Sequence, residues 1–256
     1  SNWKMFNLYN CKNMFQNCTS LNSIDGLNNW DMSNVCNMNG MFQNCISLKS
    51  IESLKNWSFF FISETSYMFA DCKSLDSLVP LSNWNMLKVR YIQNMFQNCT
   101  GITSVDCLKN WSLKNVENMQ EMFSGCSSLV SIDSLQTWNL SKVENAIGVF
   151  QNCIELKSIK SIEKWRLINL KQTKAMFYGC SSLDSIDSLK SIKMDKVSDA
   201  SYMFFGCSSI ISLDALKDWK MNKVISIEGM FANCSSIKSI EPLGNWKFEN
   251  IATCEK

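Results

Sequence analysis

The sequence predicts an α/β repeat solenoid built from about nine units of 27 residues. Three series of residues recur at this spacing, without insertion or deletion. The dipeptide Met-Phe recurs, with Val149-Phe150 as its one departure, and a cysteine stands three residues after each Phe. All nine tryptophans share one phase, and Ile192 replaces the missing member. A single unit cannot bury so many apolar groups, whereas stacked units form a continuous core.

The first element expected in each unit is a short strand. In the first unit it covers residues 21–27, where Leu21, Ile24 and Leu27 are apolar among polar neighbours. Strands of successive units would pair in parallel, roughly 4.8 Å apart, so that nine of them span about 40 Å.

The second expected element is a short helix on the opposite face, over residues 33–43. Val35, Met38, Met41 and Phe42 would form one apolar stripe along it. Its end is predicted by a residue that tolerates the left-handed conformation of a helix C-cap. Every unit has such a residue: Asn17, Asn44, Asp71, Asn98, Gly125, Asn152, Gly179, Gly206 and Asn233.

The composition argues against several classes of function. A net charge of +2 provides no global field for nucleic acid or an anionic membrane, and no apolar run approaches the ~20 residues that span a bilayer. The chain has no histidine, which excludes Ser-His-Asp and Cys-His catalysis and the usual zinc sites. No phosphate-binding glycine-rich loop is present among nine glycines. We therefore expect no enzyme activity, no cofactor and no metal.

The unbroken period indicates one solenoid domain over residues 1–256. Both termini fall within a repeat, and neither resembles the polar cap that solenoids normally need. The expectation is an excerpt of a longer array, or an array whose ends stack on partners.

Nine of the thirteen cysteines occupy one buried phase, where Cys behaves as a small hydrophobic residue. Their Cβ vectors would point the same way, which disfavours bridges within the column. Four cysteines lie off this phase and are free to react or pair: Cys11, Cys36, Cys107 and Cys254.

One surface column of the strand face is mostly acidic. It consists of Asp25, Glu52, Asp106, Asp133, Asp187, Asp214 and Glu241, with Val79 and Lys160 as interruptions. Such a column could recruit cations, glycans or a basic partner, but the favoured interpretation is a solvated face that flanking lysines neutralise. Serines two residues earlier in each unit, from Ser23 to Ser239, are expected to bond between strands.

Two places break the polar pattern toward aromatic residues. The first place consists of Phe59, Phe60 and Phe61. Phe60 and Phe61 each lie in a phase whose residues are mainly polar in the other units. Tyr178 and Phe205 replace glutamines in adjacent units and should stack side by side. Exposed apolar clusters usually mark interfaces, so these residues are candidate partner-binding sites. The alternatives are that a local helix tilt buries them, or that they merely cover a flank of the solenoid.

The unit resembles BspA-like leucine-rich repeats and related tandem repeats of surface proteins. The match is carried by Met41-Phe42-Gln43-Asn44-Cys45-Ile46-Ser47-Leu48, then Ser50-Ile51-Glu52 and Asn56-Trp57. One residue more than expected separates the Ile from the Trp. The resemblance implies a right-handed, leucine-rich-repeat-like solenoid of surface or adhesion type, and no chemistry.

These observations predict a non-catalytic scaffold that binds other proteins, laterally or by end-to-end stacking. A cell-surface adhesion module and a structural subunit of an intracellular assembly are the two settings considered. A cation- or glycan-binding surface on the acidic column is a third hypothesis.

Overall fold

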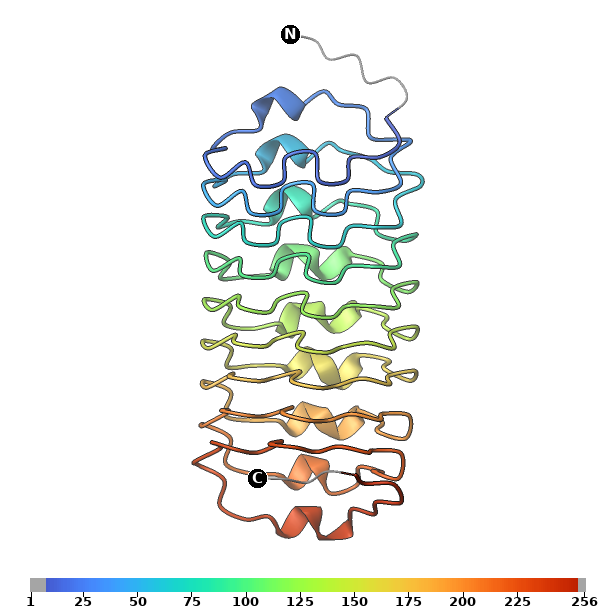
Figure 1. Cartoon of the computed structure of the whole chain (residues 1–256), viewed down its shortest axis with the longest axis vertical. Coiled ribbons are helices and arrows are strands. Elements are labelled where there is room, and N and C mark those ends of the chain that lie inside the picture. Colours follow the sequence, from blue (N-terminus) through green and yellow to red (C-terminus); the bar gives the residue numbers. More distant parts are fainter. Residues whose placement is uncertain (1–7, 253–256) are drawn as a thin grey trace.

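A computed structural model describes residues 8–252, which form a stack of coils with one coil for each 27-residue unit (Figure 1). One side of the stack carries a short 3-10 helix in each coil. In the described range these are η1 (Asp25–Leu27), η2 (Glu52–Leu54), η3 (Val79–Leu81), η4 (Asp106–Asn110), η5 (Asp133–Thr137), η6 (Lys160–Lys164), η7 (Asp187–Ser191), η8 (Asp214–Leu216) and η9 (Glu241–Asn245).

The expected strand at the acidic column is therefore wrong. Its second half is the 3-10 helix, in which the Leu27 N–H donates to the Ile24 carbonyl at 2.9 Å. On this face, one pair of residues within the described chain, Ser131 and Ser158, forms an isolated parallel bridge. Ordinary strand pairing is lost here because the Leu27 N–H bonds within its own coil and not to the next one.

The expected helix over residues 33–43 is also wrong. The opposite face consists of consecutive tight turns joined to the next coil by backbone bonds at alternate residues. Phe42 N–H donates to the Met68 carbonyl at 2.9 Å, and Asn44 N–H to the Ala70 carbonyl at 2.7 Å. Isolated parallel bridges, such as that between Asn37 and Glu64, link coils at the start of this segment.

Left-handed residues explain why no α-helix forms there. Asn44 has φ of 59°, as the sequence predicted for its phase, but it closes a turn and not a helix. A second left-handed residue stands four positions earlier, at Gly40 in this coil, also with φ of 59°. L-residues adopt this conformation singly and not in helices, so two such positions in each coil exclude a continuous helix.

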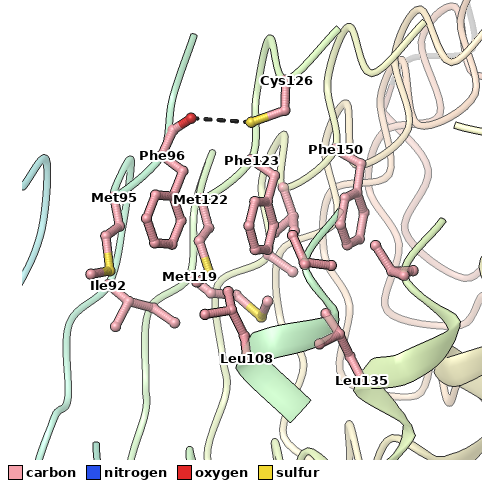
Figure 2. Packing of buried hydrophobic residues seen from close by; sticks show 14 of the residues in the cluster. Ile92, Met95, Phe96, Leu108, Met119, Met122, Phe123, Cys126, Leu135 and Phe150 are labelled. Atoms are coloured by element: carbon pink, nitrogen blue, oxygen red, sulfur yellow. Dashed lines mark hydrogen bonds between the residues drawn. The ribbon is translucent and has the colours of Figure 1, made fainter. Parts of the chain in front are cut away.

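The core lies between the two faces and consists of columns of identical side chains (Figure 2). The ring centroids of Phe42 and Phe69 are 5.7 Å apart, and those of Phe69 and Phe96 are 5.8 Å apart. Residues 27 apart in sequence are thus stacked neighbours, as predicted. The tryptophans from Trp30 to Trp219 are buried and Trp246 is half-buried, while Trp3 lies outside the described residues.

Two side-chain donors connect each coil to the preceding one. The indole N–H of Trp138 donates to the Leu108 carbonyl at 3.0 Å, and the Cys126 thiol donates to the Phe96 carbonyl at 3.1 Å (Figure 2). The same two bonds recur along the array. Ile192 has no donor, and the Ser191 hydroxyl instead contacts the Ile162 carbonyl at 3.3 Å. Within residues 8–252, no helix has the length and apolarity to cross a bilayer.

Candidate interaction surfaces

The first aromatic break divides into one core residue and two surface residues. Phe59 is only 3% exposed and packs edge-on against Trp84, with ring centroids 4.9 Å apart. It belongs to the buried column of Met32 and Met86, so its assignment to a partner-binding surface is corrected. Phe60 and Phe61 are 61% and 53% exposed. The alternative that a tilted helix buries these two is wrong, because this segment is not helical.

Phe60 and Phe61, which we call the aromatic patch, lie beside residues of the next coil. The Lys88 ammonium is 4.9 Å from the centroid of the Phe61 ring, a cation–π contact. A shallow hollow next to the patch is lined by Phe60, Ile62, Leu87 and Lys88. The patch therefore presents apolar surface with one adjacent cation.

The second aromatic pair is stacked as predicted. The rings of Tyr178 and Phe205 are 4.7 Å apart at 4° to one another, and both residues are half-buried. Tyr202 meets Phe205 edge-on at 6.1 Å, and the Tyr202 hydroxyl donates to the Glu228 carboxylate. This cluster already has partners within the chain, so it presents less free apolar surface than the aromatic patch.

The predicted acidic column lies at the first residue of the 3-10 helices. Its carboxylates are exposed, apart from the half-buried Asp133. Lys55 neutralises Glu52 at 2.6 Å, the one ion pair made by this column in the described part of the chain. Among residues 8–252, no group of three carboxylate or thiol side chains has a geometry that could hold a metal ion.

The serine column does not bond between strands in the way that was predicted. The Ser104 hydroxyl accepts the backbone N–H of Asp106, two residues on in the same coil, at 3.1 Å, and the other coils repeat this contact. Ser158 is different, because Lys160 replaces the acidic residue. Its hydroxyl donates to the Asp133 carboxylate of the preceding coil, at 2.8 Å to the nearer oxygen, and that carboxylate also accepts the Lys160 N–H. Apart from Ser158, the serines therefore bond within their own coil, to the first N–H of each 3-10 helix.

The described cysteines are all free thiols. Those of the column are buried, apart from Cys18 at its N-terminal end, and burial raises the pKa of Cys126 to about 12. Of the four off-column cysteines, Cys11 is buried with its pKa raised by desolvation to about 12, Cys36 and Cys107 are half-buried, and Cys254 lies outside the described residues. Burial and a protonated state make the column thiols unreactive.

The surface columns pair their charges between adjacent coils, which was not predicted from the sequence. In one column lysine and asparagine alternate from Lys88 to Lys196, and the Lys142 ammonium donates to the Asn115 side chain of the preceding coil at 2.8 Å. In another, Arg90 pairs with Glu117 at 2.9 Å and Lys171 with Glu144 at 2.8 Å. The signal was present in the sequence, since these partners are 27 residues apart.

Together these features define a tandem-repeat solenoid whose exposed columns are its candidate interaction surfaces. The sequence matches the family described as Mycoplasma protein of unknown function, DUF285, over residues 1–107, 102–213 and 157–256. The chain belongs to this family. Its description states no activity. No curated protein matches the chain.

Three solved structures are similar to this chain. A Treponema pallidum leucine-rich repeat protein is 19% identical, with a TM-score of 0.43, covering 70% of this chain and 73% of that one. A leucine-rich cell surface protein from Faecalibacterium prausnitzii A2-165 is 19% identical, with a TM-score of 0.37, covering 93% and 75%. An internalin from Listeria monocytogenes is 14% identical, with a TM-score of 0.25, covering 91% and 85%.

Proposed function

We propose that this chain is a non-catalytic scaffold that binds another protein through the aromatic patch of Phe60 and Phe61. The observation that carries the proposal is the exposure of two adjacent phenylalanines, 61% and 53%, in columns that are mainly polar elsewhere. Exposed aromatic residues on a folded surface usually mark an interface.

The core residue beneath the aromatic patch holds the backbone of the patch in a fixed position. Phe59 is fixed in the core against Trp57 and Trp84, so the backbone that carries its two neighbours is held in place. A preorganised surface loses little conformational entropy on binding. The adjacent Lys88 favours a partner whose apolar contact is bordered by a carboxylate.

Two settings are consistent with a scaffold. The resemblance of the unit to surface-protein repeats supports display at a cell surface. The buried, unbridged thiols favour a reducing compartment, which is the alternative setting. Protease treatment of intact cells distinguishes them, because only a surface protein is cleaved without lysis.

A photo-crosslinking amino acid at position 61 tests the patch. It should give one discrete adduct in cells that express the protein, and the same group at Asn115, in the same column, should not. Adding Phe60→Ser to the chain that carries the crosslinker at position 61 should reduce the yield of the adduct. The double variant Phe60→Ser, Phe61→Asn carries the residues that the first coil has at these positions, Ser33 and Asn34. This double variant should unfold at the same urea concentration as the original chain. Equal crosslinking at both positions, or a clear loss of stability in the double variant, would contradict the proposal.

A further inference from the structure

The exposed residue that follows the tryptophan phase changes character along the array. In the first five described coils this column has no cation: Asp31, Ser58, Asn85, Ser112 and Asn139. In the last four coils every member is basic: Arg166, Lys193, Lys220 and Lys247. All four are exposed. We call these four residues the basic column.

In two other columns most cations have a polar or acidic neighbour, although like charges do stack elsewhere, as Asp187, Asp214 and Glu241 do in the acidic column. Lys196 donates to Asn169 of the preceding coil at 2.6 Å, so an amide separates it from Lys142. Arg90 and Lys171 each pair with a glutamate of an adjacent coil. The basic column has neither arrangement, and in the described part of the chain none of its members forms an ion pair.

Carboxylates lie near the basic column but form no ion pair with it among the described residues. Asp195, Asp218 and Glu249 lie in the two flanking columns, but none is within ion-pair distance of it, and the Glu249 carboxylate accepts a hydrogen bond from Asn222. Successive coils are about 4.8 Å apart at the backbone, so neighbouring cations repel one another. A ligand with anions repeated along its length would relieve this repulsion.

The surroundings of the basic column favour a sugar chain over a nucleic acid. A shallow hollow beside Lys220 and Lys247 is lined by Lys217, Asp218, Asn222 and Asn245, and the Asn245 amide can bond to hydroxyl groups. Trp219 in this lining is 4% exposed, and Trp246 and Phe248 on either side of Lys247 are half-buried, so none of these rings is fully exposed to an unstacked base. The net charge of +2 conceals this column because acidic residues elsewhere balance it.

We propose that the basic column binds a linear polysaccharide that carries sulfate or carboxylate groups. Binding is electrostatic and lies on an open surface, with one cation contributed by each of four successive coils. This surface is separate from the aromatic patch, so the proposal does not depend on the protein-binding function.

The test measures binding of the intact chain to fluorescent heparin by anisotropy at several salt concentrations. Polygalacturonate, which has only carboxylates, shows which anion is preferred, while uncharged dextran and oligo(dT) serve as competitors. We expect heparin to bind with an affinity that falls as salt rises. The double variant Lys193→Gln, Lys220→Gln should bind about tenfold more weakly or worse. Its slope of log affinity against log salt should be smaller by about two.

The matched control is Lys142→Gln, Lys196→Gln, which removes the same charge from two lysines that each donate to an asparagine of the preceding coil. Its affinity should stay within about twofold of the original chain. All four residues are exposed, and circular dichroism confirms that each variant is folded. Equal weakening by both variants, absence of binding by the unchanged chain, or stronger displacement by oligo(dT) than by unlabelled heparin would each overturn the proposal.

Discussion

The indole bond between coils can be tested by changing Trp138 alone. Its side chain is 1% exposed, and its N–H donates to the Leu108 carbonyl at 3.0 Å. That carbonyl also accepts a hydrogen bond from the backbone N–H of Trp111, at 3.0 Å, so it keeps one partner when the indole of Trp138 is lost. Removing the bond alone should therefore cost about 1 kcal/mol of the free energy of unfolding, and not the larger penalty of a fully unpaired buried group.

Two variants separate the bond from the packing. Replacing Trp138 with benzothienylalanine removes the donor at nearly constant volume and should cost about 1 kcal/mol. Trp138→Phe removes the donor and leaves a void, which adds about 1–2 kcal/mol. Urea unfolding followed by circular dichroism measures both. The reasoning is refuted if the benzothienyl variant is as stable as the original chain, because the bond between coils would then contribute nothing.

Three further predictions concern other columns. Ile192→Trp restores the indole donor to the Ile162 carbonyl and should stabilise the array by about 0.5–2 kcal/mol, measured in the same urea assay; a destabilised variant would show that the site has repacked around Ile. Gly125→Ala should cost clearly more than Gly206→Ala. Both glycines are left-handed, with φ of 71° and 73°, but only at Gly125 would the new Cβ approach the Asn98 oxygen, at 2.2 Å; equal melting temperatures would refute the clash. Stability should also fall above pH 9. Above this pH the thiols of the unfolded chain lose their protons. In the folded chain Cys126 keeps its proton, because its pKa is raised to about 12, so the unfolded state binds fewer protons than the folded state. The slope approaches about 1.4 kcal/mol per pH unit for each such thiol, and Cys126→Ala should reduce it by that amount.

The sequence predicted which residues stack better than it predicted their backbone conformation. Val35, Met38, Met41 and Phe42 fit a helical stripe, yet their spacing equally suits a series of tight turns with inward side chains. The outcome depends on where the backbone N–H groups bond. Phe42 N–H bonds to Met68 of the next coil, and such a partner 26 residues away leaves no trace in local periodicity.

For the candidate sites too, some features were predicted from the sequence and others were not. The break at Phe60 and Phe61 was visible in the sequence because their columns are mainly polar, and the stacking of Tyr178 on Phe205 followed from adjacency in one column. The burial of Phe59 could also have been inferred, since its phase is apolar throughout. The basic column went unnoticed because the overall charge balance concealed it.

The strict 27-residue period is enough to predict a stack of coils, because it places each side chain over its equivalent in the next unit. It also determined the buried columns and the left-handed phase that includes Asn44. The tertiary structure decided that each coil holds a 3-10 helix and a run of turns in place of a strand and a helix. Bonds between coils satisfy the backbone groups that an α-helix would satisfy internally, and those bonds exist only once the coils are stacked.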